Sequence, residues 1–177
     1  MEQESLYHFV MRKFGDKYDK GGNPYITHLL SVQKRFTDRY GCMDYDCVVA
    51  CLLHDILEDT ETTEEELLEV ECVTERAVEL VKILTRQKDE TYMAYIRRVG
   101  VVEAARRIKV CDLEDNMDIT RLSSFSVEDF SLLKRYWEAW NFLNGRYIKK
   151  REKQVMSIWN IILVLGLILL LCKDWED

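Results

Sequence analysis

Residues 48–60 read VVACLLHDILEDT, an apolar run followed at once by one histidine and three carboxylates. The apolar positions predict a central, buried helix over residues 45–57. On a helix, positions i, i+1, i+4 and i+5 share one side, so the imidazole and the three carboxylates would lie together. Acids gathered in this way repel one another and lose hydration unless a cation neutralises them. The stretch therefore predicts a metal site at the end of a buried helix.

Two residues elsewhere in the chain complete a candidate ligand set. His28 falls on the preceding predicted helix, and Asp112 follows an apolar and basic run over residues 107–111. With His54 and Asp55 they offer two nitrogen and two oxygen ligands. Mixed imidazole and carboxylate ligands suit Mn, Fe, Co, Ni or Zn better than Ca. The sequence thus predicts a divalent metal held between three segments of the chain.

Each of these residues also has an ordinary alternative. His28 taken alone could be a core or surface histidine, and the acidic segment 112–115 could be a solvated helix face. Glu58 and Asp59 could face water in an acidic stretch. His8 has no acidic partner nearby and is interpreted as structural or surface. The order and spacing of all the motifs, rather than any one residue, favour a functional site.

The remaining chain predicts helices and no strands. No segment keeps an alternating apolar pattern, and only seven glycines and one proline interrupt the chain. Pro24 is expected to open a helix that ends near Tyr40, and Ser126 with Asp129 forms a capping pattern before a long helix that runs to the lysine-rich segment. Further helices are expected over residues 6–14, 62–70, 77–86, 90–99 and 102–117. The fold class is therefore all-α, with one helical domain over residues 1–148.

Composition excludes several classes of protein. A chain of 177 residues that is 47% apolar suits one folded domain and excludes a disordered chain. The net charge of −7 argues against a general nucleic-acid binder, whose phosphate contacts need clustered Lys and Arg. No secretory signal opens the chain, so the six cysteines are expected to be free thiols in a reducing cytosol. Cys42, Cys47 and Cys51 contain no CxxC pair and are interpreted as core residues rather than as a metal site.

The C-terminal segment 149–177 differs in composition from the rest. Residues 155–172 read VMSIWNIILVLGLILLLC, 18 positions without a charge. As a helix they would be about 27 Å long, close to the ~30 Å hydrocarbon core of a bilayer. The basic residues at 149–153 should stay cytoplasmic, which predicts a tail anchor with the globular domain in the cytoplasm. The alternative is an apolar helix docked on the domain or in an oligomer interface.

Three motifs, in this order, resemble the HD-domain phosphohydrolases, and within them the hydrolase domain of RelA/SpoT homologues, including their small stand-alone forms. Residues 22–28 (GNPYITH) resemble the family's G-x-P-Y-I-x-H, and residues 53–60 (LHDILEDT) its L-H-D-x-x-E-D-T. Residues 108–116 (IKVCDLEDN) resemble I-K-x-x-D-x-x-x-N. The resemblance covers about residues 5–145 and leaves out the C-terminal span. It implies an HD-domain helical bundle with an added C-terminal hydrophobic helix.

The resemblance also implies roles for single residues. His28, His54, Asp55 and Asp112 match the family's metal ligands, and the family's metal is usually Mn²⁺. The activity implied is metal-dependent removal of the 3′-pyrophosphate from guanosine tetra- or pentaphosphate, (p)ppGpp, to give GDP or GTP. That activity belongs to the stringent response and takes a small nucleotide substrate.

The acidic pair Glu58 and Asp59 matches the residues that orient or deprotonate the attacking water. Asn116 matches an asparagine that contacts the nucleotide, and Lys20 matches a basic residue that lines the nucleotide pocket. Glu58 and Asp59 are therefore expected to act on the attacking water, and Lys20 and Asn116 to bind the nucleotide, rather than to hold the metal.

One segment departs from the family pattern. Before the first glycine the family often has His-x-x-Gln-x-Arg-Lys, where this chain has Phe14, Lys17, Asp19 and Lys20. The change alters the edge of the pocket that meets the base or the phosphates. Two alternatives to an alarmone hydrolase therefore stay open. One is an HD phosphohydrolase of another nucleotide or of an NADPH-like phosphate, which a family member also takes, and the other is a catalytically silent nucleotide sensor.

Overall fold

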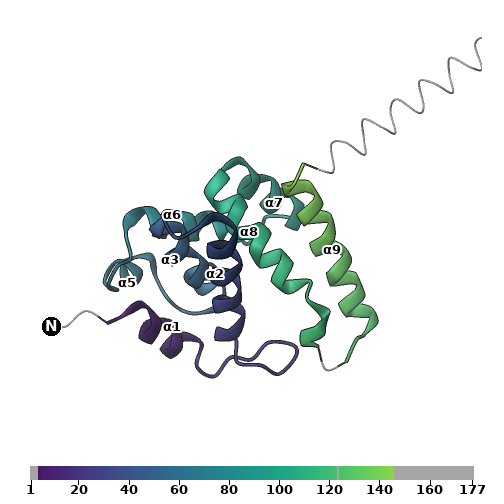
Figure 1. Ribbon diagram of the computed structural model, residues 1–177, viewed down its shortest axis with the longest axis horizontal. Coiled ribbons are helices and arrows are strands. Elements are labelled where there is room, and N and C mark those ends of the chain that lie inside the picture. The colour runs from purple at the N-terminus through teal and green to yellow at the C-terminus, as the bar shows by residue number, and fades with distance from the viewer. Residues whose placement is uncertain (1–3, 123, 146–177) are drawn as a thin grey trace, which may run out of the picture.

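The computed structural model describes residues 4–122 and 124–145, which form a bundle of helices (Figure 1). In these residues there is no strand beyond an isolated bridge between Tyr18 and Pro24. The expected all-α fold class is confirmed. The helices are α1 (Leu6–Phe14), α2 (Ile26–Tyr40), α3 (Tyr45–Leu53), α4 (Ile56–Asp59), α5 (Glu64–Leu68), α6 (Glu75–Leu84), α7 (Tyr92–Val101), α8 (Glu103–Asn116), the 3₁₀ turn η1 (Ile119–Arg121) and α9 (Val127–Leu143).

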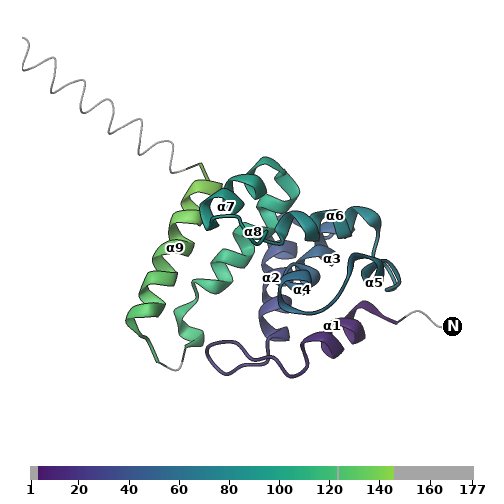
Figure 2. The ribbon, with the colours of Figure 1, turned by 180° about the vertical axis from the view of Figure 1, so that it is seen from behind.

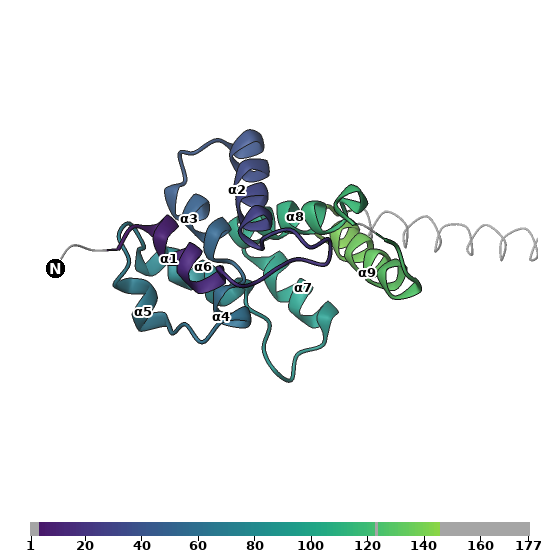
Figure 3. The ribbon, with the colours of Figure 1, turned by 90° about the horizontal axis from the view of Figure 1, so that it is seen from below.

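Helix α8 lies at the centre of the arrangement. It packs against α2 and α3 on one side and against α7 and α9 on the other, as Figures 1 and 2 show from opposite directions. Helix α3 also packs against α2 and α6. Seen from below, α9 lies at one end of the domain and α5 with α6 at the other (Figure 3). Side chains on α2, α3 and α8 can therefore meet in the interior.

Side-chain caps set where several helices begin. Ser126 and Asp129 form the predicted capping box of α9, in which each side chain bonds the other's backbone N–H. The helix expected over residues 62–70 is shorter: α5 runs from Glu64 to Leu68, because the hydroxyl of Thr63 accepts from the Glu66 N–H and caps the first turn. At its far end α9 ends at Leu143 rather than continuing to the lysine-rich segment.

The interior is apolar and includes three thiols. Large side chains such as Leu52 and Ile108 are fully buried, and Cys47, Cys51 and Cys111 lie among them. Burial, with the nearby charge of Asp44, raises the pKa of the Cys47 thiol to about 12. These thiols stay protonated at neutral pH and behave as small core residues, as the sequence predicted for Cys47 and Cys51. The same prediction was wrong for Cys42, which is exposed because it lies in the turn between α2 and α3.

The helix predicted over residues 45–57 is interrupted, and this part of the prediction was wrong. Helix α3 ends at Leu53, and α4 begins at Ile56. Asp55 has φ −103° and ψ 0°, and its carbonyl accepts the N–H of Asp59 at 2.9 Å to open the new turn. A hydrophobic pattern does not reveal such a break, because the apolar positions continue through both helices. The interruption matters for the site, since His54 and Asp55 form the corner itself.

The second helix also begins later than expected. Pro24 pairs with Tyr18 and lies outside α2, which starts at Ile26. The Pro24 carbonyl accepts from the N–H and the hydroxyl of Thr27 and so closes the turn into the helix. The loop before α2 is thereby held against the end of the helix that carries His28.

The C-terminal predictions fall on residues that the structure does not describe. In residues 4–122 and 124–145, no helix is long and apolar enough to cross a membrane. The predicted span over residues 155–172 and the domain boundary at 148 lie outside this part.

Candidate metal centre and adjoining pocket

The four predicted metal ligands approach one another in the interior. His28 comes from α2, His54 and Asp55 from the corner between α3 and α4, and Asp112 from α8. His28 Nε2 lies 3.2 Å from Asp112 Oδ1 and 3.7 Å from Asp55 Oδ2. His54 Nε2 lies 3.0 Å from Asp55 Oδ2 and 3.4 Å from Asp112 Oδ1. Residues that are far apart in the sequence thus form one cluster of donor atoms.

The outer nitrogen of each imidazole has a partner that orients the ring. His54 Nδ1 donates to the backbone carbonyl of Cys51 at 2.8 Å, and His28 Nδ1 donates to Asp115 Oδ2 at 2.7 Å. A carbonyl oxygen only accepts, so the hydrogen of His54 lies on Nδ1. Both rings therefore turn their Nε2 atoms toward the carboxylates. An imidazole held in this way is typical of metal-ligating histidines.

The donor atoms fit a divalent metal. His54 Nε2 is buried and makes no hydrogen bond of good geometry, although carboxylate oxygens of Asp55 and Asp112 lie within 3.4 Å, and such a polar atom is costly to bury unless something binds it. His28, His54 and Asp55 each offer one ligand atom, and these three atoms lie within 4.8 Å of one another. Two imidazole nitrogens with carboxylate oxygens are a set that first-row divalent metals prefer.

Electrostatics keep the two carboxylates ionised. Burial alone would raise the pKa of Asp55, but the charge of His54 and hydrogen bonds from both histidines hold it well below its usual value. Burial likewise acts against the charge of Asp112, and Lys109 overcomes it and lowers that pKa. The pKa of His54, which burial would lower, rises to about 9 through the charge of Asp55 and hydrogen bonds to both acids. Both carboxylates are therefore ionised at neutral pH, and they face histidines whose pKa values they raise.

Asp112 is held from two further sides. Lys109 Nζ lies 2.5 Å from Asp112 Oδ2, and the two residues are one helical turn apart on α8. The Asn116 side chain donates to Asp112 Oδ1 at 2.6 Å. Asp112 Oδ2 makes no hydrogen bond of good geometry, but the ammonium group of Lys109 lies next to it and offsets its charge. Two residues of its own helix, Lys109 and Asn116, thus hold the Asp112 carboxylate in place beside the histidines.

The acidic pair of the predicted site has partners other than the four predicted ligands. Glu58 is exposed, and its Oε2 accepts the backbone N–H of Arg86 at 3.1 Å. Asp59 Oδ2 lies 2.6 Å from Lys17 Nζ. The expectation that His54 and the three acids lie on one continuous helix was wrong, because the chain is interrupted at His54 and Asp55 between α3 and α4.

A pocket of about 250 Å³ opens beside His28. Its lining includes Lys20 and Asn116, the two predicted substrate contacts, but neither Glu58 nor Asp59. Leu122, Phe125, Leu132, Leu133 and Tyr136 give it an apolar wall. This combination of an apolar wall and a few polar groups is typical of small-molecule sites.

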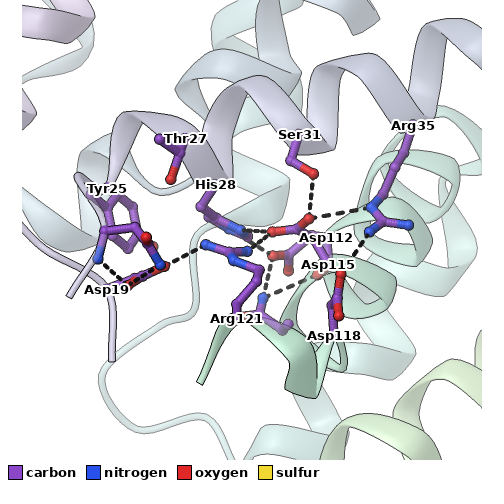
Figure 4. Close-up of polar contacts among 12 residues, drawn as sticks. Asp19, Tyr25, Thr27, His28, Ser31, Arg35, Asp112, Asp115, Asp118 and Arg121 are labelled. Carbon is purple, nitrogen blue, oxygen red and sulfur yellow. Dashed lines mark hydrogen bonds and ion pairs between the residues drawn. The ribbon is translucent and has the colours of Figure 1, made fainter. Parts of the chain in front are cut away.

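Charges in the pocket are largely paired with one another. Lys20 Nζ lies 3.0 Å from Asp129 Oδ1. The guanidinium of Arg121 bonds Asp115 with one nitrogen and Asp19 with the other, the latter at 2.6 Å (Figure 4). An anionic ligand would therefore meet cations that already have carboxylate partners.

Sequence reasoning missed three residues. Asp115, to which the sequence assigned no role beyond a possible solvated face, is 1% exposed and accepts from His28 (Figure 4). Tyr25 donates its hydroxyl to Asp55 Oδ2 at 2.5 Å, and Arg121 joins Asp115 to the loop before α2. Asp115 lies one turn after Asp112 on the same predicted helix, and this spacing is the signal that could have revealed it.

The segment that departs from the family pattern has a structural role. Phe14 is buried and stacks on Tyr25, with ring centroids 5.3 Å apart. Lys17 lies over the same ring, 4.8 Å from its centroid. Asp19 accepts from the backbone and side chain of Asn23, in addition to Arg121. Phe14, Lys17 and Asp19 therefore hold Tyr25 and Arg121, two residues that line the pocket.

Comparison with known proteins agrees with the motifs. The chain is 34% identical over 122 residues to guanosine-3′,5′-bis(diphosphate) 3′-pyrophosphohydrolase of Aquifex aeolicus, a match that covers 66% of this chain and 17% of that protein. It is 43% identical over 49 residues to guanosine-3′,5′-bis(diphosphate) 3′-pyrophosphohydrolase MESH1 of Homo sapiens, over 28% of this chain and 27% of that one. The resemblance to the hydrolase domain of RelA/SpoT homologues is confirmed.

A solved structure shows the same fold. A metazoan orthologue of SpoT, described as hydrolysing ppGpp, superposes with a TM-score of 0.64 at 19% identity, over 78% of this chain and 82% of that one. No family model matches the chain. The chain matches less than two thirds of the length of either pyrophosphohydrolase.

Proposed function

We propose that this protein is a metal-dependent phosphohydrolase that removes the 3′-pyrophosphate of (p)ppGpp. The observation that carries the proposal is the cluster of His28, His54 and Asp55, with Asp112 in contact with both imidazoles, beside a pocket for a small molecule. The relatives named as (p)ppGpp hydrolases support the choice of substrate.

In this proposal His28, His54, Asp55 and Asp112 hold one divalent metal, which the family resemblance suggests is Mn²⁺. When bound, such a metal polarises a phosphoryl oxygen and lowers the pKa of a water molecule toward neutrality. The chain's own contribution is to fix the ligands. Tyr25 assists, because burial and the charge of Asp55 raise the pKa of its hydroxyl, which keeps its proton and donates to Asp55.

Glu58 and Asp59 are proposed to handle the proton of the attacking water. Their support is indirect, because neither carboxylate contacts the cluster. Asp59 pairs with Lys17, which lies over the ring of Tyr25, and the Tyr25 hydroxyl binds Asp55. Asp59 is thus connected to the wall of the site, and Glu58 is its neighbour in α4. A general acid or base in such a position contributes typically about 10²- to 10⁴-fold to the rate.

Lys20 and Asn116 are proposed to contact the nucleotide. Asn116 lies between the pocket and Asp112, so a group bound to it would lie close to the metal ligands. Lys20 is exposed at the pocket edge, where a phosphate can compete with its partner Asp129. The apolar wall would then take the base or the ribose.

The test is a substrate panel with the full-length chain purified in detergent and Mn²⁺. Pyrophosphate and GDP from guanosine tetraphosphate, with no turnover by His54→Gln, are the expected result. Preferred turnover of NADPH or of another nucleotide would replace the substrate and keep the metal chemistry. Metal binding without turnover of any substrate would favour a sensor, and the absence of both would overturn the proposal.

The apolar segment 155–172 is proposed to anchor the protein to a membrane, with the helical domain in the cytoplasm. Its support is the sequence alone: 18 uncharged residues after a basic segment. The tagged full-length chain should sediment with membranes and resist carbonate extraction. Release into the carbonate supernatant would contradict the anchor.

A further inference from the structure

Asp115 has more partners than any role at a solvated face requires. Its Oδ2 accepts from His28 Nδ1 at 2.7 Å and from a guanidinium nitrogen of Arg121. Its Oδ1 accepts from the hydroxyl of Ser31 and from Arg35 Nε, the latter at 3.3 Å (Figure 4). With 1% of the side chain exposed, every lone pair is directed at a protein donor.

Arg121 extends this network to the pocket edge. The nitrogen that does not bind Asp115 lies 2.6 Å from Asp19 Oδ2. Asp19 is held in turn by the backbone N–H of Asn23 at 2.8 Å, within the loop that also carries Lys20. The loop packs closely on η1, since a Cβ added at Gly21 would overlap the backbone oxygen of Arg121.

We propose that Asp115 is a positioning residue for His28, and that Arg121 couples it to the pocket loop through Asp19. Asp115 keeps the hydrogen of His28 on Nδ1 and so turns Nε2 toward the metal site. Carboxylates in this position typically change metal affinity about 10- to 100-fold when they are removed. The proposal rests on the proposed function, because it assumes that His28 is a metal ligand.

The chemistry of Asn makes Asp115→Asn an informative variant. Asn offers one acceptor oxygen and one donor group, whereas the site presents donors from His28, Ser31, Arg35 and Arg121. If the amide oxygen stays with the cations, the amide NH₂ faces His28 Nδ1. The ring must then lose the contact or move its hydrogen to Nε2, the atom that would bind the metal.

The experiment measures Mn²⁺ affinity of the full-length chain by titration calorimetry, and the tautomer of His28 by ¹⁵N NMR. Asp115→Asn should bind Mn²⁺ about 100-fold more weakly, which is the upper end of the range for residues that support a metal ligand. The variant should also lose the NMR signal of the hydrogen on His28 Nδ1. Glu114→Gln is the matched control, because it makes the same change on the neighbouring residue of α8, where Glu114 pairs with Arg39 instead. It should bind Mn²⁺ like wild type.

Arg121→Gln keeps the proposal testable if the Asn variant fails to fold. It leaves the Asp115–His28 bond in place but breaks the link to Asp19, and it should weaken Mn²⁺ binding about tenfold and raise KM. Arg121→Lys should restore part of both. Wild-type metal affinity and an unchanged His28 tautomer in both the Asp115 and the Arg121 variant would overturn the inference. If wild type itself bound no metal, the proposed function would fail, and the tautomer would still decide whether Asp115 orients His28.

Discussion

The candidate metal centre and the edge of the adjoining pocket lie side by side but are stabilised differently. In the centre, His28 on α2, Asp112 on α8 and His54 at the corner after α3 are buried, and the packing of these helices fixes them. At the pocket edge, the side chain of Lys20 is 59% exposed, and it forms an ion pair with Asp129 of α9. A ligand set for a metal needs fixed geometry, which packed helices provide, while a substrate edge built from exposed ion pairs can change at little cost to the fold.

The largest effect is expected from removing a proposed metal ligand from the centre, which tests whether the centre depends on fixed ligands. His54→Gln should abolish Mn²⁺ binding and lower kcat/KM beyond the roughly 100-fold expected for a residue that only supports a ligand. His8→Gln, on the exposed face of α1, is the control and should leave both unchanged. Metal titration and pyrophosphate release measure the two effects. Normal metal binding by His54→Gln would remove His54 from the ligand set.

The next prediction concerns the acidic pair outside the cluster. Glu58→Gln should lower kcat by about 10²- to 10⁴-fold while Mn²⁺ affinity stays the same, since Glu58 contacts the Arg86 backbone and none of the proposed ligands. The measurement is single-turnover kinetics beside a metal titration. Glu61→Gln, on the exposed surface just beyond α4, provides the control. A kcat close to wild type would exclude Glu58 from the chemistry.

A third prediction tests whether the centre depends on buried charge pairs. Lys109→Met leaves Asp112 without its lysine partner and should lower the free energy of unfolding by about 3–5 kcal/mol. Lys34→Met removes an exposed pair with Asp38 on α2 and should change it little. Urea denaturation of both variants makes the comparison direct. Equal stability of the two would show that the Lys109 pair is not what holds Asp112.

The smallest expected effect is at the pocket edge. Lys20→Ala should raise KM about tenfold, the equivalent of about 1.4 kcal/mol, and leave kcat and thermal stability close to wild type. The reason is that Lys20 has only an exposed ion pair to lose and, in the proposal, one phosphate contact. Steady-state kinetics with guanosine tetraphosphate measure it. A fall in kcat with an unchanged KM would place Lys20 in the reaction rather than in binding.

Much of the fold could be predicted from sequence, because its signals are local. The capping box at Ser126 and the apolar spacing in α1 and α6 depend on residues within one or two turns. The break at His54 and Asp55 could not be predicted. The apolar pattern runs through it, and only packing against α2 and α8 shows where the corner lies.

The candidate site divides in the same way. The sequence alone determined the helical class and the donor types at positions 28, 54, 55 and 112, since motif spacing and residue chemistry need no coordinates. The tertiary structure decided that Asp115 is buried against His28, that Glu58 faces the Arg86 backbone, and that Arg121 meets Asp19. Those contacts join helices and loops that are far apart in the sequence. The direction of each side chain there is set by packing and by the need to satisfy buried charge.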